Sequence, residues 1–478
     1  MNLNSISHMP FQTIHPEFIS QLQKAVGIDN VFLDAETLDK HASDQTKNCY
    51  FLPEVVVKPR NTKGVAQVMA VCFENNIPVT VQGALSGLSG AALPVHGGVA
   101  LSMLHFDKIL HIDERNFQVT VEPGVITEHL QNVLKEKNLF YPPDPAGRGW
   151  SSIGGNVATN AGGPRCVKYG VTRDYVLNLE VVLPNGETLW TGANTLKFST
   201  GYNLTHLFIG SEGTLGVITK IVLKLLPYPN FNLLLLVPFF EAEDACKAVN
   251  AILQAGVMPS CLEFMERNAI DYAIRYCGEA SFPIKDNHQA HLLIELDGND
   301  MNVLQNDCEK IAEVVSHLNA DDILFADSES IKNELWKLRR NVSNAVTTLS
   351  QQKIAEDTVV PRAEVPILLR GVKKICEDND VLSVCWGHLG DGNLHVNIIT
   401  ESTTDDDWHE RAIKSKMEIF KLVKSLGGML SAEHGVGYTQ KDFMPLFFNP
   451  PHLSILRGIK SVFDTKGILN PGKVMGNG

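Results

Sequence analysis

At 478 residues the chain is too long for a single hydrophobic core, so two or three domains are expected. Its 44% hydrophobic and 20% charged residues are the proportions of an ordinary globular protein. The net charge of −13 and the dispersed lysines and arginines argue against nonspecific binding to nucleic acid or to an anionic membrane surface.

The cysteine pattern predicts free thiols rather than a metal cluster or a disulfide framework. The closest two of the nine cysteines are nine residues apart, so no Cys-x-x-Cys pair is present to hold zinc or an iron–sulfur cluster. An odd count favours a reducing compartment. Residues 1–14 lack the basic start and apolar core of a signal peptide. The longest apolar stretch, 233–240, is far shorter than the ~20 residues that span a bilayer.

After a predicted helix at 16–26, a β-α-β unit begins the main pattern. It consists of a strand at 55–57, a helix over 62–75 with its apolar residues on one face, and a second strand at 77–81. The unit leads into a run of small residues, 82–92, where backbone amides can surround an anion. The glycines there fit neither G-x-G-x-x-G nor a Walker loop. A phosphate cradle and a tight turn therefore both remain open.

A second and longer cluster of small residues covers 142–146 and 151–163. Such a run could be a disordered linker. Ile153 and Val157 are spaced through it, which favours close backbone packing against a large flat ligand. Other elements predicted before residue 226 are strands at 99–102 and 118–121, a helix at 127–137, and a strand at 174–183 that ends in a hairpin turn at 184–186. A third, glycine-rich segment covers 210–219 and precedes a strand that ends near Leu226.

A change of pattern after Leu226 indicates a second domain of mixed α/β type. Its predicted elements are strands at 232–238 and 291–297 and helices at 241–254, 327–349 and 410–425. The helix at 327–349 carries Arg339 and Arg340. Arginines on helices ordinarily lie on a solvated face, so position alone gives neither residue a role.

Two histidines flank a predicted hairpin turn at Asp391-Gly392. Counting outward from this turn places His388 opposite His395, with Cβ atoms about 4.5–5.5 Å apart. Asn397 shares their face because strand side chains alternate. Such a pair is often structural, since imidazole also packs as a half-buried aromatic ring.

A later dipeptide, Glu433-His434, is flanked by glycine and adds a carboxylate and a third imidazole. Two histidines and one carboxylate are typical of a divalent metal site with open coordination positions. His434 could then act as a general base. The combination favours a functional site over a structural histidine pair.

The order of the three glycine-rich segments, together with His388, His395 and Glu433-His434, resembles the FAD-linked oxidase family of the vanillyl-alcohol-oxidase flavoprotein fold. Within it the D-2-hydroxyacid dehydrogenases are most similar, and the resemblance covers residues 50–478. It implies an α+β fold whose FAD-binding domain has two α/β subdomains, with an α/β cap domain and a C-terminal segment that returns to the flavin. The expected boundaries are an N-terminal helical segment at 1–50, the FAD-binding domain at 51–228, the cap at 229–430 and the C-terminal segment at 431–478.

The resemblance implies noncovalent FAD, because the first loop lacks the histidine that carries the flavin in covalent relatives. The family loop usually begins Arg-Gly-Gly-Gly-Thr, and the departures here weaken its charge complement. The residues implied to bind FAD are Gln82, Gly83, Ala84, Leu85, Ser86, Gly87, Leu88, Pro143, Asp144, Ile153, Gly154, Gly155, Asn156, Thr159, Asn160, Gly162, Glu212, Gly213, Val217, Ile218 and Asn470.

The resemblance also implies a divalent metal, with zinc expected, held by His388, His395 and Glu433, and His434 as the catalytic base. The implied substrate-binding residues are Arg339, Ser343, Lys353 and Asn397. The reaction would oxidise a D-2-hydroxyacid of the D-lactate or glycolate type to the 2-oxoacid. D-2-hydroxyglutarate is an alternative, although Ala355 stands where dehydrogenases of that dicarboxylate place a second lysine.

Lacking clustered cysteines, the chain needs a separate electron acceptor, either quinone-linked or an electron-transfer protein. A homodimer in the cytoplasm is expected, with no integral membrane segment and with membrane attachment only through the acceptor. Two other classes remain open. One is a noncatalytic flavin-binding subunit of an electron-transfer complex, and the other is nonredox flavin chemistry of the ether-lipid synthase type.

Overall fold

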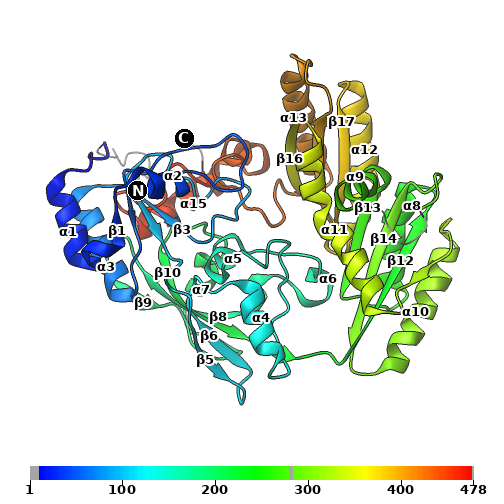
Figure 1. The fold of residues 1–478 in the computed structure, drawn as a ribbon, viewed down its shortest axis with the longest axis horizontal. Helices are drawn as coiled ribbons and strands as arrows, with labels where there is room; N and C mark the ends of the chain where they lie inside the picture. Colours follow the sequence, from blue (N-terminus) through cyan, green and yellow to red (C-terminus); the bar gives the residue numbers. More distant parts are fainter. Residues whose placement is uncertain (1–9, 279–283, 476–478) are drawn as a thin grey trace. The chain divides into compact units, whose positions relative to one another are not determined.

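The computed structural model describes residues 10–278 and 284–475, so the first nine residues of the predicted N-terminal segment lie outside it. The described chain divides into two compact units. Unit 1 takes residues 10–161, 171–228 and 433–475, and unit 2 takes 162–170 and 229–432. Figure 1 follows the chain from blue through green to red, so that unit 1 contains both its blue and its red ends.

A four-stranded sheet in unit 1 has the order β1-β2-β4-β3, with β4 parallel to both β2 and β3. Its apolar strands and α3 form one buried core. The first elements of unit 1 are α1 (Pro16–Val26), β1 (Val31–Phe32), α2 (Ala35–Lys40), β2 (Val55–Val57), α3 (Thr62–Asn75), β3 (Val79–Gln82) and β4 (Val99–Ser102). Since β3 extends to Gln82, this residue ends the strand instead of opening the loop, a correction to the predicted strand at 77–81.

Unit 1 also contains a five-stranded antiparallel sheet, in the order β5-β6-β10-β8-β9. The turn between β8 and β9 lies at the predicted hairpin position, with Gly186 at φ +86°. The remaining elements are β5 (Ile109–Asp113), β6 (Gln118–Val121), α4 (Thr127–Lys135), β7 (Leu139–Phe140), α5 (Ile153–Thr159), β8 (Val176–Val182), β9 (Thr188–Trp190), α7 (Leu204–Phe208), β10 (Val217–Lys224), β11 (Leu226–Pro227), α14 (Met444–Phe447) and α15 (Pro450–Phe463).

Unit 2 is built on a seven-stranded sheet in the order β15-β12-β14-β13-β17-β18-β16. Helices α9 and α11 cover one face, and α8, α10, α12 and α13 pack on the other (Figure 1). The strands are β12 (Phe231–Phe239), β13 (Cys261–Glu266), β14 (Ala290–Gly298), β15 (Leu324–Phe325), β16 (Gln352–Val359), β17 (Leu382–His388) and β18 (Asn393–Thr400). The helices are α6 (Cys166–Tyr169), α8 (Ala242–Gln254), α9 (Arg267–Cys277), α10 (Met301–Ser316), α11 (Glu329–Leu349), α12 (Val365–Asp378) and α13 (Trp408–Ser425).

The register of the β17–β18 hairpin differs from the prediction. His395 pairs with Trp386 instead of His388, because Leu389–Asp391 form a 3₁₀ turn and Gly392 closes the loop at φ +88°. The register is therefore shifted by two residues. Since side chains alternate with a period of two, His388 and His395 still point to the same face of the sheet.

The second cluster of small residues is also more regular than predicted. Residues 153–159 form the short helix α5, with the Ser152 hydroxyl accepting a hydrogen bond from Gly155 N–H at its N-terminus. Gly154 packs against Pro123 so closely that a Cβ would lie 2.4 Å from the Pro123 Cβ. Small residues here allow a helix to approach neighbouring backbone, and the sequence pattern does not distinguish that from irregular packing.

His291 lies fully buried in β14, and neither ring nitrogen has a hydrogen-bond partner among the described residues. Burial lowers the pKa of His291 from 6.5 to about 3. Between these two pH values the unfolded chain binds a proton that the folded chain does not, so stability falls as the pH falls through this window. We expect His291→Leu to raise the free energy of unfolding by about 1–3 kcal/mol and to flatten this acid dependence. Urea unfolding at pH 7 and pH 5 measures both effects.

The matched control is His111→Leu, since His111 is exposed in β5. It should leave the acid dependence unchanged. An unaltered slope between pH 7 and pH 5 in the His291→Leu variant would show that the wild-type imidazole binds protons equally in the folded and the unfolded protein, contrary to this prediction.

Candidate active site

A row of polar side chains crosses one face of the unit 2 sheet and forms the core of the site. We call Glu263, His388, His395, Asp357 and Asn397 the polar row. Glu263 pairs with His388 across β13 and β17, and His395 pairs with Asp357 across β18 and β16. All five residues are buried. The two imidazole rings lie 5.3 Å apart between centroids at an interplanar angle of 85°. The structure therefore brings together the two histidines that the sequence singled out.

Each of these histidines has a carboxylate next to its Nδ1 atom. His388 Nδ1 donates to Glu263 Oε1 at 2.8 Å, and His395 Nδ1 lies 3.5 Å from Asp357 Oδ1. A carboxylate in this position favours the tautomer with the proton on Nδ1, which leaves the lone pair on Nε2. Metal-binding histidines usually have this arrangement. The donor chemistry of the pair thus fits a divalent metal.

Asp357 also fixes the chain just before the Glu433-His434 dipeptide. Its Oδ2 accepts hydrogen bonds from the Ser431 hydroxyl and from Ala432 N–H, both at 2.9 Å. Glu433 is the next residue along the chain. The same carboxylate that lies beside His395 therefore holds the backbone from which the predicted third ligand extends.

On the other side of the dipeptide, the chain is held within unit 1. The Ser89 hydroxyl donates to the His434 carbonyl at 2.9 Å. Glu212, buried in the third glycine-rich segment, accepts from Val436 N–H and Gly437 N–H at 2.8 Å each. Burial raises the pKa of Glu212 to about 7. The Glu212 carboxylate, which the sequence had assigned to cofactor contact, thus fixes the segment that carries His434.

Arg339 reaches the polar row from α11. Its Nη2 lies 2.6 Å from Glu263 Oε2, and its Nε–H is buried without an acceptor among the described residues. The Oδ1 atom of Asn397 is likewise buried, with no donor in the described part of the chain. An unpaired buried donor or acceptor costs about 1–3 kcal/mol. The face thus presents one N–H donor and one amide acceptor suited to a small polar ligand.

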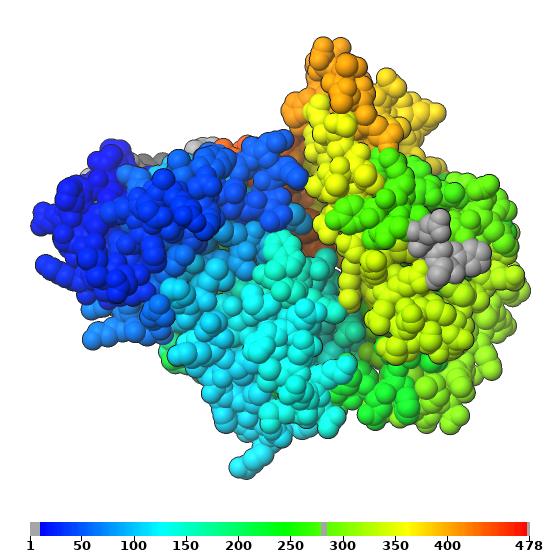
Figure 2. Space-filling model, viewed as in Figure 1, coloured from blue at the N-terminus to red at the C-terminus, as the bar shows by residue number. Residues whose placement is uncertain are grey.

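Two other predicted substrate residues lie on α11 and β16. Ser343 follows Arg339 by about one turn of α11, and its side chain is exposed whereas Arg339 is buried. The exposed side of α11 is part of the surface shown in yellow in Figure 2. Lys353 is half-buried in β16 and donates from Nζ to the Thr347 hydroxyl at 2.6 Å. Sequence reasoning missed Glu263 and Asp357, although Glu263 is an acid between the apolar residues Leu262 and Phe264 of a strand.

The three glycine-rich segments of unit 1 meet one another. A Cβ on Gly83 would lie 2.7 Å from the Ser152 hydroxyl, so only glycine lets the first loop approach α5 this closely. Glu212 N–H donates to the Ala158 carbonyl at 2.8 Å, which joins the third segment to the second. Asn470 donates from Nδ2 to the carbonyls of Ala91 and Glu212. The segments therefore form a continuous surface of backbone, which fits a large flat ligand with a diphosphate.

Several predicted cofactor residues use their side chains to build this surface. Gln82 is buried and donates to the carbonyls of His41 and Ala92, while its Oε1 lies 2.6 Å from His41 Nδ1. Asn156 donates to the Thr127 hydroxyl at 2.6 Å. These side chains therefore join the loops to neighbouring segments of unit 1. Of the other predicted cofactor residues, Leu85 has φ +56° and Val217 and Ile218 are buried in β10.

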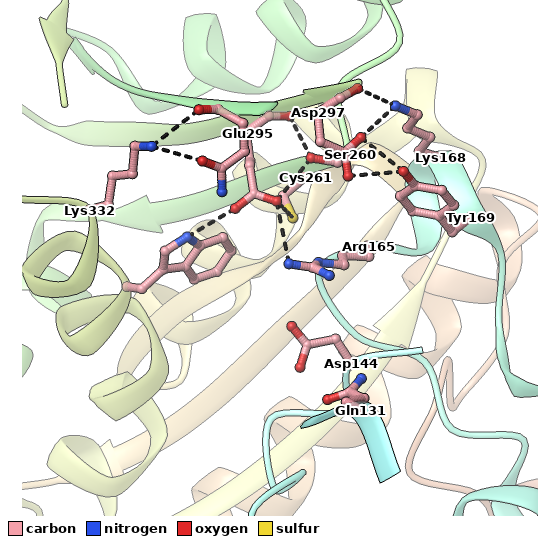
Figure 3. A network of polar contacts seen from close by, with 12 residues as sticks. Gln131, Asp144, Arg165, Lys168, Tyr169, Ser260, Cys261, Glu295, Asp297 and Lys332 are labelled. Atoms are coloured by element: carbon pink, nitrogen blue, oxygen red, sulfur yellow. Dashed lines mark hydrogen bonds and ion pairs between the residues drawn. The ribbon is translucent and has the colours of Figure 1, made fainter. Parts of the chain in front are cut away.

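A short segment, residues 162–170, interrupts unit 1 and packs in unit 2. We call it the strap. Figure 3 shows its side chains facing two acids of β14. Lys168 Nζ lies 2.5 Å from Asp297 Oδ1, and the Tyr169 hydroxyl donates to the same carboxylate at 2.9 Å. Arg165 Nη2 lies 3.7 Å from Glu295 Oε1. The predicted cofactor residue Gly162 begins this segment, and no sequence signal marks its packing.

Family comparisons agree with this architecture. Residues 53–192 match an FAD binding domain, and residues 228–474 match the C-terminal domain of FAD linked oxidases. The chain belongs to the FAD-linked oxidases. As in the resemblance drawn from the sequence, this oxidoreductase combines an FAD-binding domain with a C-terminal domain of mixed helix and sheet.

Relatives of this FAD-linked oxidase align over nearly their whole length. The glycolate oxidase subunit GlcD of Bacillus subtilis is 36% identical, with 91% of each chain covered. The D-lactate dehydrogenase of Anaerostipes hadrus is 38% identical over 88% of this chain and 89% of its own. The D-2-hydroxyglutarate dehydrogenase of Stutzerimonas stutzeri is 31% identical over 96% and 99%.

Among solved structures, p-cresol methylhydroxylase has the same fold, with a TM-score of 0.80 at 19% identity over 96% of each chain. None of the nine cysteines of the FAD-linked oxidase, all of which lie in the described residues, forms a disulfide. Within residues 10–278 and 284–475, none of the helices has the length and apolar character needed to cross a bilayer.

Proposed function

We propose that this FAD-linked oxidase is a dehydrogenase that oxidises a D-2-hydroxyacid of the D-lactate or glycolate type to the 2-oxoacid. The observation that carries the proposal is the polar row, in which two buried imidazoles, each beside a carboxylate, lie on the sheet face that Arg339 reaches. Relatives named for D-lactate and for glycolate support the substrate class.

The proposed metal ligands are His388, His395 and Glu433, with zinc as the expected ion. A bound divalent metal would act as a Lewis acid and lower the pKa of a coordinated substrate hydroxyl. The two histidines provide the nitrogen donors, and Glu263 and Asp357 orient them through Nδ1. Glu433 would provide the oxygen donor that completes the set.

Two groups on the same face would hold the substrate. Arg339 Nε–H would donate to a carboxylate oxygen, which gives this buried donor an acceptor. Asn397 Oδ1 would accept a hydrogen bond from the substrate hydroxyl before that proton is transferred. Together these contacts fix the hydroxyl-bearing carbon relative to the carboxylate, as stereospecific oxidation requires.

His434 would accept the hydroxyl proton as a general base. Its imidazole Nε2 lies 3.9 Å from Glu433 Oε1, and its backbone is held by Ser89. FAD, when bound, supplies the electron sink that takes a hydride from the substrate carbon. In this scheme the chain's own residues bind the substrate, orient it and remove one proton.

The structure favours a monocarboxylate over a dicarboxylate. Ala355 pairs with Asn397 across β16 and β18 and therefore brings no charge to the polar row. Lys353, two residues earlier, has its Nζ bonded to Thr347. D-2-hydroxyglutarate remains the second candidate, because a D-2-hydroxyglutarate dehydrogenase is among the relatives.

Anaerobic mixing of the purified yellow protein with substrate tests the proposed function. D-lactate or glycolate should bleach the flavin absorbance, whereas L-lactate should not, and D-2-hydroxyglutarate should react at least ~10-fold more slowly because it lacks a partner for its second carboxylate. If no D-2-hydroxyacid reduces the flavin, the proposal is wrong. Absence of about one divalent ion per chain would instead favour the noncatalytic flavin-binding subunit.

Electrons would leave through a separate acceptor, either quinone-linked or an electron-transfer protein. The cysteine spacing, with no two closer than nine residues, argues against an iron–sulfur relay within the chain. A homodimer located in the cytoplasm completes the proposal.

A further inference from the structure

Glu263 connects two proposed functions through one carboxylate. It lies in the middle of β13, is fully buried, and belongs to the polar row. Its carboxylate accepts from His388 Nδ1 at 2.8 Å through Oε1 and lies 2.6 Å from Arg339 Nη2 through Oε2. The two donors come from different elements, the end of β17 and the middle of α11. They converge on Glu263, since Arg339 Nη2 is 3.5 Å from His388 Nδ1.

The contact to His388 determines which nitrogen can bind a metal. With Nδ1–H donated to Glu263, the lone pair lies on Nε2, and the ring cannot rotate without breaking this bond. An amide in place of the carboxylate would keep the shape but would remove the negative charge that makes the imidazole a better ligand. The position of His388 therefore depends on the charge of Glu263.

The contact to Arg339 determines which edge of the guanidinium remains for a ligand. Nη2 is occupied by Glu263, while the buried Nε–H has no acceptor among the described residues. Because the guanidinium is planar and rigid, fixing Nη2 also fixes the direction of Nε–H. Glu263 thereby aims the donor that the proposed function assigns to the substrate carboxylate.

We propose that Glu263 is a positioning residue that couples the metal-binding imidazole of His388 to the substrate-binding guanidinium of Arg339. The inference rests on the proposed function. The buried carboxylate of Glu263 thus sets both the metal affinity and the substrate affinity, although it contacts neither the metal nor the substrate. A purely structural ion pair would affect folding stability but neither affinity.

The same strand provides a matched control. Glu266 is also buried in β13, but it lies on the opposite face of the strand from Glu263. It is paired with a cation, Lys373, at 2.5 Å, and accepts from Cys385 N–H at 2.8 Å. Glu266 is thus a buried, cation-paired acid whose partners lie outside the polar row. Removing the charge of Glu266 therefore measures the effect on stability of losing a buried acid from this strand.

The experiment compares Glu263→Gln with Glu266→Gln in the FAD-loaded protein after the metal has been removed and titrated back as Zn²⁺ against a competing chelator. We expect Glu263→Gln to weaken Zn²⁺ binding by about 10–100-fold. The KM for D-lactate should rise by about 10-fold or more, with a smaller change in kcat at saturating Zn²⁺ and substrate. Glu266→Gln should lower Tm yet leave the Zn²⁺ affinity and KM unchanged.

If Glu263→Gln lowers only Tm and leaves Zn²⁺ affinity and KM as in the Glu266 variant, the inference is overturned. Should Glu263→Gln not accumulate as folded yellow protein, Glu263→Asp and Glu266→Asp replace the pair. The shorter aspartate side chain in the Glu263→Asp variant keeps the charge but cannot reach both partners. The same two affinities should therefore fall, and unchanged values would again overturn the inference.

The wild-type protein separates this result from the proposed function. Flavin reduction by D-lactate in the wild type with unchanged affinities in the Glu263 variant refutes only the coupling. When no hydroxyacid reduces the wild type, the proposed function fails, and the Zn²⁺ titration still tests whether Glu263 positions His388.

Discussion

His434→Ala should lower the rate of flavin reduction by D-lactate about 10²–10⁴-fold while FAD and the metal stay bound. The reason is that the imidazole of His434 is the proposed base, whereas its backbone carries the structural contacts. The Ser89 hydroxyl bonds to the His434 carbonyl, and Glu212 holds Val436 and Gly437. Removing the imidazole leaves these contacts intact. Anaerobic stopped-flow absorbance, with flavin and metal content measured on the same sample, tests the prediction.

His129→Ala is the matched control for this variant. His129 is exposed on α4 in unit 1, and alanine suits a helix, so the rate should not change. A His434 variant that keeps more than about one tenth of the wild-type rate would exclude general-base catalysis by this residue. Loss of flavin or metal from the variant would contradict the expectation that only proton transfer is affected.

His395→Ala should remove the divalent ion and lower kcat/KM for D-lactate by about 10³-fold or more, with the flavin retained. Lewis-acid activation contributes several kcal/mol, and each 1.36 kcal/mol corresponds to a factor of about ten. The metal content measured by elemental analysis should fall from about one divalent ion per chain toward zero. Chelator treatment of the wild type should give the same loss of activity, and added metal should restore the wild type but not the variant.

His291→Leu serves here as the control for losing a buried histidine from the same sheet. His291 pairs with Met265 and lies outside the polar row, so its replacement should leave metal content and kcat/KM unchanged. Full metal content in His395→Ala would show that the proposed ligand set is wrong.

The shared face of His388 and His395 could be predicted from the sequence because it depends only on strand periodicity. The register was wrong by two residues, since the 3₁₀ turn at Leu389–Asp391 has no clear signature beyond its Asp-Gly. A shift of two preserves the face of every side chain, and a shift of one would have reversed it. The prediction that the two histidines share a face is therefore correct even though the predicted turn is wrong.

Glu263 could not be assigned from the sequence, because its partners lie 76 and 125 residues further along the chain and meet it only when β13, β17 and α11 pack together. The same holds for Gln82 and Asn470. Both were predicted to bind the cofactor, and their side-chain amides donate to backbone carbonyls of neighbouring loops, contacts that the sequence does not show. Sequence motifs identify which segments form a site, whereas the direction of each polar side chain depends on what packs beside it.

During synthesis on the ribosome, the strap is made well before the strand of unit 2 on which it packs. Lys168 and Asp297 are 129 residues apart, so the cation is synthesised long before its acid. At a synthesis rate of roughly 5–20 residues per second, Asp297 of β14 is made about 6–26 s after Lys168 of the strap. A recombinant fragment that begins at residue 229 never contains it, and the buried carboxylates of Glu295 and Asp297 then lack Arg165 and Lys168. Expression of residues 229–432 alone should therefore require residues 162–170 to be grafted onto them.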